Sequence, residues 1–200
     1  MIPRLHAITN DHILNLPDLD ERLHAIVAAG PVGLHLRGQR TTGRRLAEIG
    51  RRLVDEGVNV LVNDRVDLVP YIGAVGVHLP ATGLPTADVR RLLGSEVVIG
   101  RSTHDPDEAK DASAAGADFV FLGPIWNTRS HPDHPGLGTS AIRDAQPATV
   151  IAIGGVTPDR VTACLEQGAY GVAVITALWE AADPRSVAAQ MLVSLGETHS

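Results

Sequence analysis

The chain has 200 residues, of which 44% are hydrophobic, and its 17 Lys and Arg against 23 Asp and Glu give a formal net charge of −6. This size and hydrophobic content suffice for one buried core, so we expect a single domain over residues 1–200. The acidic balance argues against a general nucleic-acid binder. The single cysteine, Cys164, excludes an intramolecular disulfide and a cysteine metal cluster. Without an apolar run of about 18 residues or a basic, apolar leader, we expect a cytoplasmic protein that does not bind membranes.

Short apolar runs alternate with longer helical patterns along the whole chain. The expected strands are Leu5–Ile8, Gly33–Arg37, Asn59–Asn63, Val75–Leu79, Val97–Arg101, Asp118–Gly123, Thr149–Gly154 and Gly171–Ile175. The clearest expected helices are Leu19–Ala29, Gly43–Glu56, Asp107–Ala115 and Pro158–Gln167. Near-continuous Val, Ile and Leu runs are typical of parallel strands covered by helices. The pattern predicts the α/β class and a single (β/α)₈ TIM barrel, with an open doubly wound sheet as the alternative.

The strand ends carry polar groups that a closed core would not favour. Residues two apart in a strand face the same side, so His35 and Arg37 are expected to project together. Asn63 ends the third strand, His78 lies in the fourth, and Ser102 and His104 follow the fifth. Because active sites of these barrels lie at the carboxyl ends of the strands, we expect a polar pocket there. A structural role for each single histidine remains the alternative.

The longest irregular segment, Pro124 to Thr139, is expected to be a lid over this pocket. Its polar residues are Asn127, Thr128, Arg129, Ser130, His131 and His134. We expect Thr128, Arg129 and Ser130 to contact substrate. His131 joins His35 and His104 as a candidate catalytic residue, while Arg37, Asn63 and Ser102 are candidate substrate contacts.

A phosphate site is expected where the last two strands end. Gly154-Gly155 follows the seventh strand, and Ile175-Thr176 ends the eighth before a short helical piece. Backbone amides at a glycine turn and at a helix start can hold a phosphate without a cationic side chain. Gly155, Ile175 and Thr176 are therefore candidate phosphate contacts.

These residues resemble the thiamine phosphate synthase and thiazole tautomerase superfamily over nearly the entire chain. The matching pieces are Leu34-His35-Leu36-Arg37, Val62-Asn63-Asp64-Arg65-Val66-Asp67-Leu68, Gly76-Val77-His78-Leu79, Ile99-Gly100-Arg101-Ser102-Thr103-His104, Gly116-Ala117-Asp118, Gly123-Pro124-Ile125 and Ile151-Ala152-Ile153-Gly154-Gly155. The resemblance implies a phosphate-binding barrel that acts on thiamine precursors.

The synthase branch joins a pyrimidine diphosphate to a thiazole phosphate with the help of magnesium, and this chain departs from its pattern. Gln-x-Arg-x-Lys on the second strand reads here as His35, Arg37 and Gln39. The two magnesium carboxylates would fall at Asp64 and Gly83, so one survives, and Asp64 has the alternative role of capping the next helix. A further lysine aligns with His131. These departures predict weak coupling activity.

The tautomerase branch resembles this chain in Leu5-His6-Ala7-Ile8-Thr9, in His35, in Leu79-Pro80 and in Gly155-Val156-Thr157-Pro158-Asp159-Arg160. That branch moves a proton between two carbons of a carboxythiazole phosphate without a metal, although its catalytic histidine aligns with Pro124. We therefore expect a thiazole tautomerase with no cofactor and a thiazole phosphate as its small-molecule partner; a homodimer stays open. The alternatives are a thiamine phosphate synthase, which would need Mg²⁺, and a non-catalytic barrel that binds thiazole phosphate or has a regulatory role.

Overall fold

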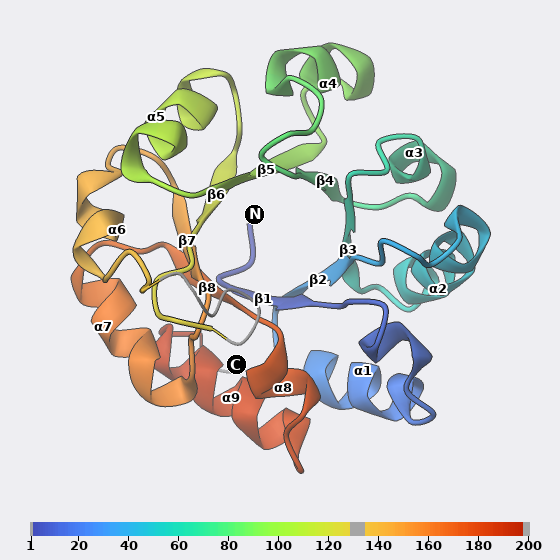
Figure 1. The fold of residues 1–200 in the computed structure, drawn as a ribbon. Coiled ribbons are helices and arrows are strands. Elements are labelled where there is room, and N and C mark those ends of the chain that lie inside the picture. The colour runs from blue at the N-terminus through green and yellow to red at the C-terminus, as the bar shows by residue number, and fades with distance from the viewer. Residues whose placement is uncertain (1, 129–134, 198–200) are drawn as a thin grey trace.

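Eight parallel strands close into a barrel in the computed structural model, which describes residues 2–128 and 135–197 (Figure 1). The strands are β1 (Leu5–Ile8), β2 (Val32–Leu36), β3 (Asn59–Asn63), β4 (Gly76–Leu79), β5 (Val98–Thr103), β6 (Phe119–Leu122), β7 (Val150–Ile153) and β8 (Gly171–Val174). Each strand pairs with its neighbours in sequence, and β8 pairs with β1. The predicted TIM barrel is confirmed, and the open-sheet alternative is wrong.

Helices follow the strands and cover the outside of the barrel (Figure 1). They are α1 (Leu19–Val27), α2 (Gly43–Asp55), α3 (Leu68–Ile72), α4 (Thr86–Leu93), α5 (Pro106–Ala114), α6 (Ser140–Asp144), α7 (Val161–Glu166), α8 (Thr176–Trp179) and α9 (Pro184–Ser194), with short 3₁₀ turns η1 (Ile13–Asn15) and η2 (Pro158–Arg160). No helix in the described ranges is long and apolar enough to cross a membrane.

The strand side chains divide between two apolar layers. One layer joins the outer barrel wall to the helices and includes Leu34, Val62 and Trp179. The other fills the barrel and consists of Ile8, Leu61, Phe119, Phe121, Ile151 and Ala173. Ile2, which precedes β1, also packs against this inner layer. The barrel is therefore a filled core, and ligands must approach its ends.

Two glycines make room for rings inside the barrel. A Cβ on Gly33 would lie 3.0 Å from His6 Nδ1, and one on Gly100 would lie 2.2 Å from Phe119 Cζ and 2.6 Å from His78 Nδ1. A larger residue at Gly100 would collide with Phe119, and one at Gly33 would require the His6 ring to shift by a few tenths of an ångström. Glycine in these strands thus serves close packing, one of the roles expected for it there.

The sequence-based boundaries differ from the structure by one or two residues in most elements, but two local expectations fail. The single helix predicted over Pro158–Gln167 is split into η2 and α7. Asp64 does not cap the next helix, because α3 begins only after Asp67. Instead Asp64 has a left-handed backbone with φ of 62°.

Candidate active site

The carboxyl ends of the parallel strands form one mouth of the barrel, and most predicted site residues lie there. Asn63 is the last residue of β3, Ser102 is the next-to-last residue of β5, and Arg37 directly follows β2. Across the ring, Gly155 follows β7 and Thr176 begins α8 after β8. Because the strands are parallel and form a closed ring, their carboxyl ends bring these predicted residues to one mouth of the barrel.

His35 lies deeper than its neighbours, in a buried group with His6 and His78. All three side chains are at most 1% exposed. His6 Nδ1 and His35 Nε2 are 2.8 Å apart, and His6 Nε2 lies 2.8 Å from the Pro3 carbonyl oxygen. His78 stacks on Phe121 with ring centroids 4.0 Å apart. Sequence reasoning did not select His6, although it shares the inward parity of Ile8 in β1.

Burial keeps these three rings neutral. Desolvation lowers the pKa of His6 to about 4, with a partly opposing hydrogen bond to Pro3, and it lowers the pKa of His78 to about 3. Desolvation, and then the nearby His6 and His78, hold the pKa of His35 well below 6.5. A general acid or base at neutral pH needs a pKa near 7. The surroundings of His35 therefore do not support the acid–base role expected for it.

Two polar side chains connect this buried group to the mouth. Ser102 Oγ is 2.9 Å from His78 Nε2. The Asn63 side chain interacts with His35, where its hydrogen bond opposes part of the fall in pKa. Asn63 Oδ1 is nevertheless buried without a partner of good hydrogen-bond geometry among the described residues.

The two arginines near the mouth have different settings. Arg101 donates to the carbonyl oxygens of Ala81 and Leu84 at 2.8 and 2.7 Å, so it braces the β4–α4 loop. Arg37 is anchored through its backbone, whose N–H donates to Thr9 Oγ1 at 2.9 Å. Arg37, partly buried just after β2, therefore stays a predicted contact for a substrate anion.

The loop after β7 is shaped by glycines and held by an arginine. Gly154 and Gly155 have φ of 90° and 69°, values that other residues rarely adopt. Arg160 donates from Nη1 to the Gly155 carbonyl oxygen at 2.6 Å. Its guanidinium also lies 4.9 Å from the ring centroid of Trp126. Sequence reasoning did not select Arg160, since nothing local indicates that it reaches back to Gly155.

The remaining predicted residues lie farther along the loops. His104 is exposed, and its Nδ1 lies 3.0 Å from the Gly123 carbonyl oxygen. Thr128 has a buried hydroxyl without a partner in the described part of the chain. Ile175, partly buried, precedes α8. Arg129, Ser130, His131 and His134 lie outside the described residues.

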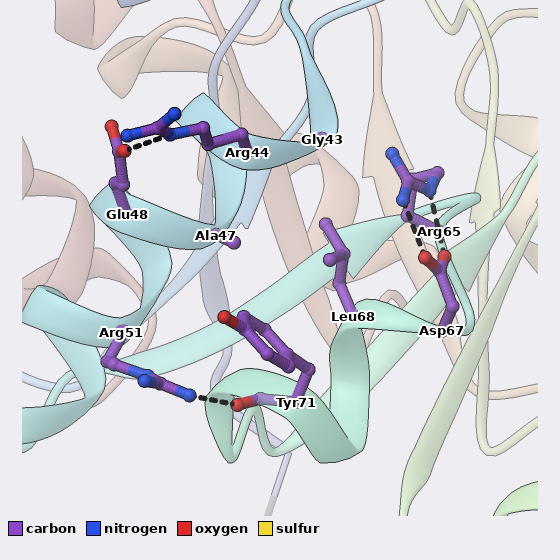
Figure 2. Close-up of a pocket in the computed structure, with 9 residues that line it drawn as sticks. All are labelled: Gly43, Arg44, Ala47, Glu48, Arg51, Arg65, Asp67, Leu68 and Tyr71. Carbon is purple, nitrogen blue, oxygen red and sulfur yellow. Dashed lines mark hydrogen bonds and ion pairs between the residues drawn. The ribbon is translucent and has the colours of Figure 1, made fainter.

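A separate hollow of about 460 Å³ lies on the outer wall between α2 and α3 (Figure 2). Its charged groups already have partners: Arg44 pairs with Glu48, and Arg65 pairs with Asp67. Arg51 donates to the Tyr71 carbonyl oxygen at 2.8 Å. Because this groove is outside the barrel and its charges are paired, the mouth remains the candidate site.

A magnesium site of two carboxylates does not fit the residues at the mouth. Asp64 stands after β3, but the second family position is Gly83. A Cβ there would lie 2.9 Å from Pro80 Cδ, so a larger side chain would displace this turn. Within the described ranges, no group of three His, Cys, Asp or Glu side chains could hold a metal ion.

The closed barrel with its polar mouth defines a protein of the TIM-barrel class. The thiamine monophosphate synthase family matches residues 5–178. A thiamine-phosphate synthase of Natronomonas pharaonis is 41% identical over 174 residues, 82% of this chain and 81% of that protein. One of Shouchella clausii is 34% identical and covers 97% of both chains. The chain belongs to the thiamine monophosphate synthase family.

A solved structure supports the same assignment. Thiamine phosphate pyrophosphorylase of Pyrococcus furiosus has a TM-score of 0.81 and 27% identity, over 97% of this chain and 96% of that one. The expectation of a thiazole tautomerase is wrong, because these relatives carry synthase names. The departures at His35, Gln39 and Gly83 from the synthase pattern therefore did not justify the tautomerase expectation.

Proposed function

We propose that this chain is a transferase that couples a pyrimidine diphosphate to a thiazole phosphate and releases pyrophosphate. The carrying observation is a mouth with two facing halves, polar side chains on β2–β5 and a glycine loop after β7. Relatives named thiamine-phosphate synthase that are 34% and 41% identical support this reaction over other barrel chemistry.

The two halves suit two anionic substrates. As the bond between the rings forms, the bond to the diphosphate breaks, and the leaving group takes the electron pair. Arg37 is the cation assigned to this charge, since a guanidinium can pair with two phosphate oxygens at once. Asn63 and Ser102 border the same region as polar substrate contacts. The backbone amides of Gly155, Ile175 and Thr176 are assigned to the thiazole phosphate.

The proposed reaction assigns no role to a metal ion. Mg²⁺ commonly uses one or two carboxylates together with substrate phosphates. This chain offers Asp64 alone at the family positions, so its residues do not reproduce the two-carboxylate site, and no step is assigned to a metal here.

A coupling assay tests the proposal. Purified protein is incubated with both substrates, with Mg²⁺ or with a chelator, and thiamine phosphate and pyrophosphate are measured. We expect equal amounts of both products over many turnovers. Arg37→Ala removes the assigned cation and should lower the amount of both products. Arg40→Ala is its matched control, since Arg40 is exposed in the loop just beyond. Absence of product at stoichiometric protein with Mg²⁺ would show that the proposed function is wrong.

A further inference from the structure

A chain of buried polar groups runs from the start of β1 across to β3. The Pro3 carbonyl oxygen lies 2.8 Å from His6 Nε2, and His6 Nδ1 lies 2.8 Å from His35 Nε2. The Asn63 side chain is the next group beyond His35. His6 and His35 are both fully buried, so no solvent competes for these contacts.

The carbonyl end sets the direction of every bond in this chain. A carbonyl oxygen only accepts, so His6 Nε2 must carry the hydrogen. His6 is neutral at physiological pH, because burial lowers its pKa to about 4. Its Nδ1 therefore holds a lone pair and accepts from His35 Nε2–H. His35 is neutral by the same burial, so its Nδ1 also holds a lone pair.

The last step concerns the Asn63 amide. His35 Nδ1 and Asn63 Oδ1 are both buried and lack a partner of good geometry within the described residues. Both atoms are acceptors once the direction above is set, so they cannot bond to each other. Turning the amide by 180° brings its NH₂ group to His35 Nδ1. Oxygen and nitrogen of an amide are assigned from just such networks.

We propose that His6 and His35 are positioning residues that hold the Asn63 NH₂ group inward and its carbonyl oxygen toward the barrel mouth. The mouth then presents a fixed acceptor, which selects a substrate N–H or O–H donor. The use of this acceptor by substrate rests on the proposed function, whereas the direction of the bonds does not.

Nitrogen-15 NMR of the histidine- and asparagine-labelled protein at pH 7 tests the direction of the bonds without any substrate. We expect His6 and His35 to be protonated at Nε2 only. Scalar couplings should link His35 Nε2 to His6 Nδ1 and Asn63 Nδ2 to His35 Nδ1. A hydrogen on His35 Nδ1, or an imidazolium at either ring, overturns the proposal. His78, which contacts Ser102 instead, is the internal reference.

Two variants of His6 then connect the bonds to turnover. His6→Leu removes the acceptor, whereas His6→Asn keeps an oxygen near the place of Nδ1. We expect His6→Leu to lose the Asn63 coupling and to lower kcat/KM by about tenfold, the low end for groups that orient a ligand-contacting residue. His6→Asn should recover most of both. Intact wild-type couplings with no thiamine phosphate formed would reject the proposed function alone. A folded His6→Leu that keeps the Asn63 coupling would reject the positioning role.

Discussion

The two halves of the barrel interior differ in chemistry. Strands β1–β5 contribute imidazole, amide and hydroxyl groups, among them His6, His35, His78 and Ser102. Strands β6–β8 contribute Phe119, Phe121, Ile151 and Ala173, so the polar groups expected to bind substrate on that side lie in the loops. One half can therefore bind through side chains, and the other through backbone groups.

This difference separates how substitutions act. On the side-chain half, a change of residue alters charge or hydrogen bonding while the backbone stays in place. On the loop half, Gly154 and Gly155 have φ of 90° and 69°, so the shape of the backbone decides which residues these positions accept. A substitution there acts through strain and blocked approach.

The largest expected effect is a loss of stability in acid, caused by the buried histidines of the side-chain half. The folded pKa of His6 is about 4 and that of His78 about 3, both below the 6.5 of an unfolded histidine. As pH falls, the unfolded chain therefore takes up protons first. The stabilisation is complete above pH 6.5 and is lost from there toward pH 4, by up to about 1.4 kcal/mol per pH unit for each histidine.

Urea unfolding between pH 7.5 and 4.5 measures this slope. His78→Leu should make the free energy of unfolding less dependent on pH. His12→Gln is the matched control for the removal of one histidine, since His12 is exposed. Equal slopes in the wild type and in His78→Leu would contradict the prediction.

The second effect strikes the loop half. In Gly155→Val, the new Cβ would lie 2.8 Å from Trp126 Cβ and 3.3 Å from the Asn127 carbonyl oxygen, at a φ of 69°. We expect KM for the thiazole phosphate to rise roughly 100-fold, which corresponds to the upper range of backbone strain at a binding site. Steady-state kinetics measures this change.

Gly168→Val is the control for strain alone. Gly168 has φ of 89° but lies after α7, and its Cβ would meet only Gln146 Nε2, at 3.3 Å, and Gln146 Cδ. It should lose stability while KM stays close to the wild-type value. If both variants raise KM equally, the loop after β7 is not a specific phosphate contact.

The sequence predicted the fold well because strand and helix periods are local signals. The period of two in β2 also placed His35 and Arg37 on one side. The chain of buried polar groups from His6 through His35 to Asn63 could not be predicted from the sequence, since it depends on the register of three strands. The reaction was predicted wrongly. The departures at His35 and Gly83 favoured the tautomerase branch, whereas the whole chain resembles relatives named thiamine-phosphate synthase.

The smallest expected effect concerns the side-chain half, where the missing second carboxylate is expected to limit coupling. Gly83→Asp restores an acidic group at the second family position, and Mg²⁺ held by two carboxylates would stabilise a diphosphate leaving group better than one held by Asp64 alone. We expect about a tenfold gain in magnesium-dependent coupling, the order of a modest electrostatic contribution to the transition state. Gly83→Asn is the matched control, because its Cβ meets Pro80 in the same way but adds no charge. Both variants should unfold at lower urea, since that Cβ would lie 2.9 Å from Pro80 Cδ, and only the Asp variant should gain activity with Mg²⁺. An equal rate in the two variants would contradict the prediction that the missing carboxylate at position 83 limits coupling.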